Sequence, residues 1–156
     1  MAQTSYYPWS FSLFPSPQAV RAPRSLTTDA DGRKKRILCV EDNQASQALV
    51  HAILEVLGFI IEDAGTLETA RTRLSAGRFD LVLLDINLPD GNGLDLVGEL
   101  KANPATGDVP IIAVSGLSLE SVRQTALHLG CCAYVTKPIR VAGFVNLIKQ
   151  CLSQTC

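Results

Sequence analysis

Residues 81–96 read LVLLDINLPDGNGLDL, and this stretch decides the fold. The strand-like run Phe79–Leu84, of which residues 81–84 open this stretch, ends at the carboxylate of Asp85. A loop rich in Gly, Asn, Pro and Asp follows, and a short helical pattern then runs from Leu94 to Lys101. A strand that is apolar at every position, rather than at every second one, is typical of a parallel sheet covered on both faces. The stretch therefore predicts a buried strand, a polar loop at its carboxyl end and a helix.

The same strand-then-helix order recurs on both sides of this stretch. The other strand-like runs are Ile37–Val40, Phe59–Ile61, Ile111–Val114 and Ala133–Val135. The other helical stripes, with apolar residues three or four positions apart, are Leu49, Ala52, Ile53, Val56 and Leu57; Leu67, Ala70 and Leu74; Leu119, Val122, Ala126 and Leu129; and Phe144, Leu147, Ile148, Cys151 and Leu152. Five alternating units joined by short right-handed crossovers predict an α/β fold, a doubly wound five-stranded parallel sheet with five helices.

The first 35 residues differ from the rest of the chain. Residues 1–36 hold four of the eight prolines and five of the nine aromatic residues, and six basic residues against two acidic ones give them a charge of +4. Closely spaced prolines exclude a continuous helix, and no alternating strand pattern appears. We expect residues 1–35 to be a disordered or loosely packed tail before a domain at 36–153. An aromatic docking segment and an organelle-targeting peptide are the alternatives.

Bulk composition excludes several classes of function. The net charge of −1 argues against non-specific binding to nucleic acid, and no apolar run approaches the ~18–20 residues that a membrane span needs. The five cysteines contain no C-x-x-C pair, so a zinc site is not expected. Cys39 and Cys132 fall in strand-like runs and are predicted to be small buried thiols. We therefore expect a reducing, cytoplasmic environment.

Polar residues gather where the predicted strands end. Glu41 and Asp42 follow the first strand, Asp85 the third and Ser115 the fourth, and Lys137 comes shortly after the fifth. In doubly wound sheets the ligand site lies at the carboxyl ends of the strands. These five side chains are therefore expected in one pocket.

The expected pocket suits phosphoryl acceptance. Close carboxylates repel one another by about 4 kcal/mol per pair at an effective dielectric near 20, and Mg²⁺ relieves such repulsion through oxygen ligands. A carboxylate such as Asp85 can take a phosphoryl group, while the metal and Lys137 neutralise its charge and Ser115 donates a hydrogen bond. Each residue also has an ordinary structural alternative. Glu41 and Asp42 can cap a helix, Asp85 can end a turn, and Lys137 can be a surface lysine.

Four segments resemble the receiver domain of two-component response regulators, the CheY-like family. They are ILCVEDN (37–43), LVLLDINLPDGNGLDL (81–96), IIAVSG (111–116) and AYVTKPI (133–139). The resemblance covers about residues 36–153 and implies a flavodoxin/CheY-like three-layer sandwich. The segment KPIRVAGFVNLIKQCL (137–152) is most similar to stand-alone receivers of the cell-cycle relay type.

The resemblance also implies roles for individual residues. It assigns the Mg²⁺ ligands as Glu41, Asp42, the phosphoacceptor Asp85 and the backbone carbonyl of Asn87. It assigns the phosphate-contacting lysine as Lys137, the switch hydroxyl as Ser115 and the rotating aromatic as Tyr134. In that family the Lys137–Pro138 peptide is cis, although only about 5–6% of X-Pro bonds are cis in general. The departures are small: Ser115 stands for the commoner threonine with Gly116 after it, and Glu41 for aspartate.

Partners follow from the same resemblance. It implies that a sensor histidine kinase or a histidine phosphotransfer protein donates the phosphoryl group. It also implies that helix 119–129, strand 133–136 and helix 141–152 form the face that meets a downstream protein. No output domain follows Cys156, so we expect a cytoplasmic phosphoacceptor that signals by protein contact, without nucleic-acid or membrane partners and without enzymatic activity beyond its own phosphorylation and dephosphorylation.

Other readings of the sequence are weaker. A phosphohydrolase of the haloacid dehalogenase type needs a second acid two residues after the nucleophile, where this chain has Asn87. A flavodoxin-like carrier would place the FMN phosphate beside Glu41 and Asp42, which would repel it. A receiver-shaped binding module that is never phosphorylated stays open, since fold does not settle function. His51 and His128 each lie two residues from a stripe position, which favours exposed helix residues over phosphorylated histidines.

Overall fold

Five parallel strands form one sheet in the order β2-β1-β3-β6-β7. The computed structural model describes residues 25–154 of the chain. The strands of the sheet are β1 (Arg36–Val40), β2 (Ile60–Ala64), β3 (Leu81–Asp85), β6 (Ile111–Ser115) and β7 (Ala133–Thr136). The helices are α2 (Gln44–Leu57), α3 (Leu67–Ala76), α4 (Gly93–Ala102), α5 (Glu120–Leu129) and α6 (Val141–Gln154), and a small antiparallel pair, β4 (Asn87–Leu88) and β5 (Gly91–Asn92), lies between β3 and α4. The predicted doubly wound sheet with five helices is confirmed.

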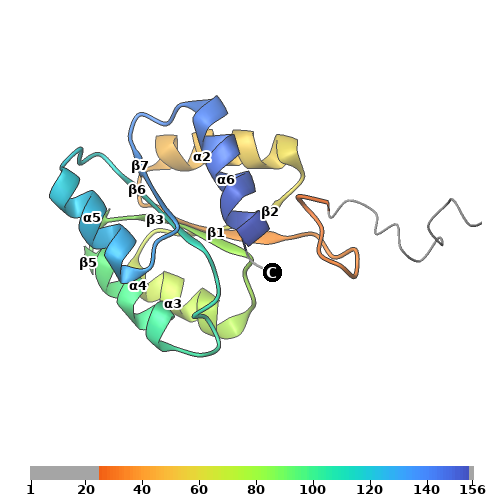
Figure 1. Cartoon of the computed structure of the whole chain (residues 1–156), viewed down its shortest axis with the longest axis horizontal. Coiled ribbons are helices and arrows are strands. Elements are labelled where there is room, and N and C mark those ends of the chain that lie inside the picture. The colour runs from red at the N-terminus through yellow and green to blue at the C-terminus, as the bar shows by residue number, and fades with distance from the viewer. Residues whose placement is uncertain (1–24, 155–156) are drawn as a thin grey trace, which may run out of the picture.

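The sheet lies between two layers of helices. Helices α2 and α6 cover one face, and α3, α4 and α5 cover the other (Figure 1). Successive residues of β1 alternate between the two cores: Leu38 and Val40 pack with the α3–α4–α5 side, whereas Ile37 and Cys39 pack with the α2–α6 side. All five residues of β3 are buried, which explains why that strand is apolar at every position before Asp85.

Local sequence signals set several helix ends. The Thr66 side chain accepts a hydrogen bond from the backbone N–H of Thr69 and so caps α3, as predicted. Gly58 ends α2 with a φ of 94°, a left-handed conformation that glycine adopts without steric cost. Because α2 ends at Gly58 and α3 begins after Thr66, only short loops join these two helices to β2.

The predicted stripe of α2 is wrong in phase by one residue. Val50, Ile53 and Leu54 are buried, whereas Leu49 is 40% exposed and Val56 is 88% exposed. A shift of one residue turns a helix face by 100°. Because this helix is apolar on more than one face, periodicity alone did not fix the side that meets the sheet.

Helix α5 also departs from its predicted stripe. Ala126 is buried and Val122 packs partly against the core, as expected. Leu119, which is the N-cap residue, is 58% exposed, and Leu129 at the other end is 36% exposed. The ends of this short helix therefore present apolar side chains to solvent.

The segment just before β1 folds back onto the domain. Thr28 and Lys34 pair in an isolated antiparallel bridge, and Leu26 packs against the α2–α6 core. Arg33 forms ion pairs with Asp29 and with Asp80, which precedes β3. Residues 1–24 lie outside the described residues, so the division between a tail at 1–35 and a domain at 36–153 stays a prediction.

The prediction of free thiols holds for only one of the two cysteines. Cys39 is buried and free. Cys132 instead forms a disulfide with Cys151, with their Cα atoms 6.2 Å apart, so that prediction is wrong. The reason is tertiary, because α6 packs across the start of β7 and brings together two residues 19 positions apart.

Among residues 25–154, no helix combines the length and the apolar composition that a membrane crossing requires.

Candidate functional site

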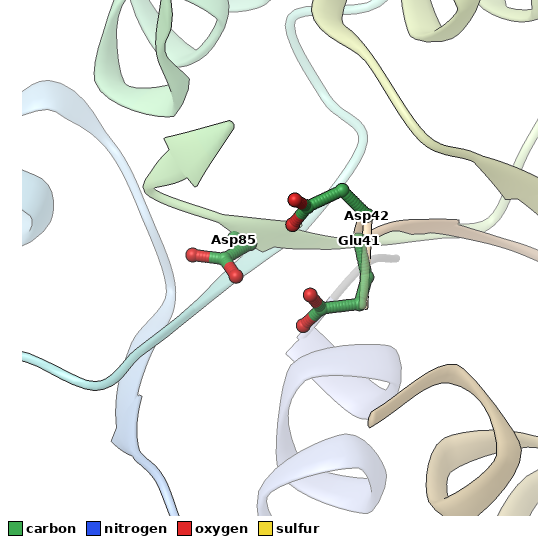
Figure 2. Close-up of side chains that lie close together, drawn as sticks. All are labelled: Glu41, Asp42 and Asp85. Carbon is green, nitrogen blue, oxygen red and sulfur yellow. The ribbon is translucent and has the colours of Figure 1, made fainter. Parts of the chain in front are cut away.

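Three carboxylates meet at the carboxyl edge of the sheet. Glu41 and Asp42 directly follow β1, and Asp85 is the last residue of the neighbouring strand β3, with Val40 and Leu84 paired across the two strands. One oxygen atom from each of the three lies within 4.8 Å of the others, and Figure 2 shows the side chains gathered at the two strand ends. Glu41 and Asp85 are only 5% and 6% exposed, whereas Asp42 is exposed. The predicted convergence of these carboxylates is what the structure shows.

Lys137 joins two of these carboxylates. Its Nζ donates to Glu41 Oε2 at 2.5 Å and to Asp85 Oδ2 at 2.8 Å. Its backbone N–H donates to the Ser115 carbonyl at 2.8 Å, which fixes the start of this loop against the end of β6. The Lys137–Pro138 peptide is cis, as the resemblance implied.

Burial and charge act against each other at this site. Burial raises the pKa of Glu41, although hydrogen bonds from Lys137 and from the Asn43 N–H favour its ionised form. Burial alone would lower the pKa of Lys137, but its hydrogen bonds to Asp85 and Glu41 outweigh that effect and raise it, so the ammonium stays charged. The site holds three carboxylates, and Lys137 pairs with only Glu41 and Asp85, so the local negative charge is not fully balanced and favours a hard cation. Carboxylate oxygens are the donors that Mg²⁺ prefers, so the residues fit that ion.

The loop after Asp85 is held close to the site. The backbone N–H of Asn87 donates to Asp85 Oδ1 at 2.9 Å, so each oxygen of Asp85 accepts one hydrogen bond. Gly93 at the start of α4 lies against the main-chain carbonyl of Asp85, where a Cβ atom would come within 2.3 Å of that oxygen. Gly93 was not among the residues predicted from the sequence to form the site. The one sequence feature that could have identified it is its position as the last glycine of the polar loop after Asp85.

Asp90 is a second residue near the site that was not predicted from the sequence. Its carboxylate accepts hydrogen bonds from the backbone N–H groups of Leu67 at 2.9 Å and Glu68 at 3.1 Å. These bonds lower the pKa of Asp90, the Leu67 bond most strongly. The side chain thus ties the β4–β5 loop to the first turn of α3, where unpaired amides and the helix dipole favour an anion.

Leu117 connects the two residues predicted to form a switch. Ser115 is fully buried, and its Oγ accepts a hydrogen bond from the Leu117 N–H at 3.1 Å. Tyr134 Oη donates to the Leu117 carbonyl at 2.7 Å, while the Tyr134 ring is partly buried against the α3–α4–α5 core. One loop residue therefore contacts both Ser115 and Tyr134.

The two histidines lie away from the carboxylates. His128 is exposed, as predicted. His51 is half-buried, and its Nε2 lies 2.8 Å from Asp63 Oδ1, so the prediction of a plain exposed residue is wrong for it. The reason is that β2 presents Asp63 beside α2.

A cavity of about 910 Å³ lies away from the carboxylates, at the amino edge of the sheet beside Asp29, Phe79 and Pro110.

Comparison with known proteins gives one consistent family. The family described as "Response regulator receiver domain" matches residues 37–149. The polar-differentiation response regulator DivK of Brucella anthropi is 34% identical over 126 residues, which cover 76% of this chain and 96% of that protein. A gliding motility regulatory protein of Myxococcus xanthus is 30% identical over 117 residues, which cover 75% of this chain but only 15% of that much longer protein.

Solved structures agree. A CheY-like response regulator receiver domain protein from Methanospirillum hungatei JF-1 has a TM-score of 0.72 at 30% identity, covering 78% of this chain and 95% of that one. The receiver domain of the sensor histidine kinase PA1611 from Pseudomonas aeruginosa PAO1 has a TM-score of 0.70 at 28% identity, covering 76% and 98%. That structure carries a magnesium ion coordinated in its active-site cleft.

Proposed function

This chain belongs to the response regulator receiver domain family, and from that premise we propose that it accepts a phosphoryl group on Asp85 and signals by contact with another protein. The observation that carries the proposal is the pairing of a buried Asp85 with Lys137, beside the carboxylates of Glu41 and Asp42. Glu41 and Asp85 are both buried beside one ammonium, and an uncompensated buried charge costs free energy, which favours a functional site over a purely structural ion pair.

The proposed reaction makes one bond and breaks one. A carboxylate oxygen of Asp85 attacks phosphorus, while the phosphorus–nitrogen bond of a phosphohistidine breaks and its imidazole leaves. Mg²⁺, held by Glu41, Asp42, Asp85 and the Asn87 carbonyl, would supply positive charge against the phosphoryl oxygens. Lys137 turns from Asp85 toward a phosphoryl oxygen, and Ser115 donates its hydroxyl hydrogen to another. The magnesium ion in the related PA1611 receiver domain supports the choice of metal.

The proposed partners follow from the family and from the surface. The donor is a sensor histidine kinase or a histidine phosphotransfer protein, and the protein works in the cytoplasm, with no nucleic-acid or membrane partner and no enzymatic activity beyond its own phosphorylation and dephosphorylation. The output surface consists of α5, β7 and α6. Among residues 25–154, four of the seven exposed large apolar side chains lie on or beside these elements: Leu117, Leu119, Leu129 and Val141. Such side chains are suited to a protein contact.

The domain is assigned to residues 36–153. The family match at 37–149 supports that range. Residues 1–35 are proposed to be dispensable for phosphorylation. The contacts of Leu26 and Arg33 stabilise the fold at the amino edge of the sheet, far from the carboxylates.

Intact mass tests this function. The protein is incubated with a small-molecule phosphodonor, with and without Mg²⁺. We expect a mass gain of one phosphoryl group only with Mg²⁺, and its loss in Asp85→Asn. The variants Asp95→Asn, His51→Ala and His128→Ala are the controls and should be labelled as the wild type is. Labelling that persists in Asp85→Asn contradicts the assignment. A folded wild type that is never labelled favours a binding module instead.

A further inference from the structure

Cys132 and Cys151 join two parts of the fold. Cys132 immediately precedes β7, and Cys151 lies in the last turns of α6. Their disulfide therefore attaches the C-terminal half of α6 to an edge strand of the sheet. Among residues 25–154, this disulfide is the one covalent cross-link between α6 and the rest of the fold.

The other described cysteines cannot take part in this bond. Cys131 is buried in the α3–α4–α5 core, on the opposite face of the sheet from Cys132, which packs with the α2–α6 core. Cys39 is buried in the centre of β1. Burial raises the pKa of Cys39 to about 12 and that of Cys131 to about 11, which keeps both in the unreactive thiol form. Among residues 25–154, Cys132 and Cys151 are the one pair that meets.

The two cysteines differ in exposure. Cys132 is half-buried, whereas Cys151 is only 3% exposed. A small molecule therefore reaches the bond from the Cys132 side. The fold also has a full hydrophobic core on each face of the sheet, so it does not need a covalent staple to hold together. A bond that is accessible at one end and not essential for folding can open and close in the native protein.

We propose that Cys132 and Cys151 form a reversible thiol–disulfide exchange site for small disulfides of the glutathione class. In the closing direction, the Cys132 thiolate attacks one sulfur of oxidised glutathione and releases one glutathione thiolate. The Cys151 thiolate then attacks the Cys132 sulfur of the mixed disulfide and releases the second. The two cysteines lose two electrons, the oxidised glutathione gains them, and the two protons end on the released glutathione thiols. Excess reduced glutathione runs the same steps in reverse.

Closing the bond fixes the end of α6. A disulfide stabilises a protein mainly by restricting the unfolded chain, and here it closes a loop of 19 residues. Opening the bond should lower the melting temperature by roughly 10 °C and loosen the last turns of α6 first. Because Cys132 stands at the amino end of β7 and the carboxylates stand at the carboxyl edge, phosphorylation of Asp85 should be equal in both states. The proposal of an exchange site can therefore be tested independently of the proposed function.

Redox equilibration of the full chain tests the site. The protein carries Cys156→Ser, which removes the terminal thiol outside the described residues, and is equilibrated in buffers from fully reduced to fully oxidised glutathione. The sample is then unfolded in denaturant and alkylated, so that intact mass counts every free thiol, the buried Cys39 and Cys131 included. We expect four labelled cysteines in reduced buffer and two in oxidised buffer, with peptide mapping placing the bond at Cys132–Cys151. Amide hydrogen exchange should be faster in residues 148–154 of the reduced form.

Substitution of each cysteine shows which of the two reacts with glutathione. In the same Cys156→Ser background, Cys151→Ala should accumulate one glutathione adduct on Cys132, whereas Cys132→Ser should take none. Cys131→Ala is the matched control and should still close the bond. A wild-type bond that never opens in reduced buffer, or thiols that never pair in oxidised buffer, would overturn the proposal. So would an adduct on Cys131, because it would show that the accessible thiol is another one.

Discussion

Gly93 lies so close to the main-chain carbonyl of Asp85 that the chain has no room for a side chain there. A Cβ atom would also come within 3.1 Å of the Ile86 Cα, and the Gly93 N–H donates to the Ile86 carbonyl at 2.7 Å. This contact sets the distance between the first turn of α4 and the end of β3. Backbone atoms cannot yield as the tip of a flexible side chain can, so any side chain at this position must push the two elements apart.

Substitution of Gly93 should therefore be costly. We expect Gly93→Ala to lower the free energy of unfolding by about 2–3 kcal/mol and to weaken Mg²⁺ binding, because Asp85 must shift with its backbone. The matched control is Gly98→Ala in the same helix, where nothing lies within 4 Å of the added Cβ. That change should raise stability by up to about 1 kcal/mol through helix propensity. Urea denaturation checks both, and equal effects of the two substitutions would contradict the close contact.

Asp42 offers a test of the metal site. Its carboxylate is exposed, yet one of its oxygens lies within 4.8 Å of those of Glu41 and Asp85. Removing its charge relieves repulsion when no metal is bound, so Asp42→Asn should raise stability by about 1 kcal/mol without Mg²⁺, after allowance for solvent screening. The same change should weaken Mg²⁺ binding by roughly tenfold or more, since a ligand is lost. Thermal unfolding and calorimetric titration measure the two effects. Asp95→Asn, which removes an equal charge from α4, should show neither.

The pair of His51 and Asp63 predicts a pH dependence of stability. The hydrogen bond to Asp63, with Glu55 nearby, raises the pKa of His51 above its unfolded value of 6.5. A raised pKa contributes stability that is fully present below the unfolded value and is lost as pH rises through the folded value. The wild type should therefore exceed His51→Gln by about 0.5–1 kcal/mol near pH 5.5, with the advantage shrinking above pH 6.5. Denaturation across this pH range checks it.

A matched substitution controls this prediction. His128 is exposed on α5, and among residues 25–154 no carboxylate forms an ion pair with it. His128→Gln should therefore change the pH profile less than His51→Gln. A His51→Gln profile parallel to that of the wild type would show that the pair adds nothing to stability.

The order of the elements could be predicted because the central strands are almost wholly apolar and several helices have a clear start or end signal. Thr66 and Gly58 are such signals, and both act as expected. The convergence of Asp85 with the Glu41–Asp42 pair followed from topology alone, since parallel strands end on one edge. These features depend on local sequence and on one rule of chain connection.

The remaining features depend on contacts between residues that are far apart in the chain, and the spacing of residues in the sequence does not reveal such contacts. Asp90 caps a helix that begins 23 residues earlier in the chain, so no local capping pattern identifies it. Cys132 meets Cys151 because of how α6 packs, and α2 carries exposed apolar residues such as Leu49 and Val56 beside its buried face, so periodicity alone did not identify the residues that meet the sheet. In each case the deciding contact joins residues far apart in sequence.

The last prediction concerns the way phosphorylation reaches the output surface. The Leu117 N–H donates to Ser115 Oγ, and the Leu117 carbonyl accepts from Tyr134 Oη. A phosphoryl group on Asp85 carries a charge of about −1.5 to −2 and three strong acceptor oxygens, which can accept the hydroxyl hydrogen of Ser115. Rotation of Ser115 toward these oxygens would carry its Oγ away from the Leu117 N–H. If Ser115 turns toward the phosphoryl group, the Leu117 N–H loses its partner and the loop moves. Tyr134 then turns inward, and the surface of α5 and β7 changes shape.

Amide NMR with a bound phosphoryl mimic tests this route. In the wild type we expect shift changes at the metal site and through residues 116–136. In Ser115→Ala the changes should stay near Asp85, because the hydroxyl that couples the phosphoryl group to Leu117 is missing. In Tyr134→Phe, which removes only the bond to the Leu117 carbonyl, the loop should still respond while the response at α5 weakens. The size of the shift is limited by how differently the phosphoryl group contacts the two states. Wild-type changes confined to the metal site would mean that Ser115 and Tyr134 form no switch, even with Asp85 phosphorylated.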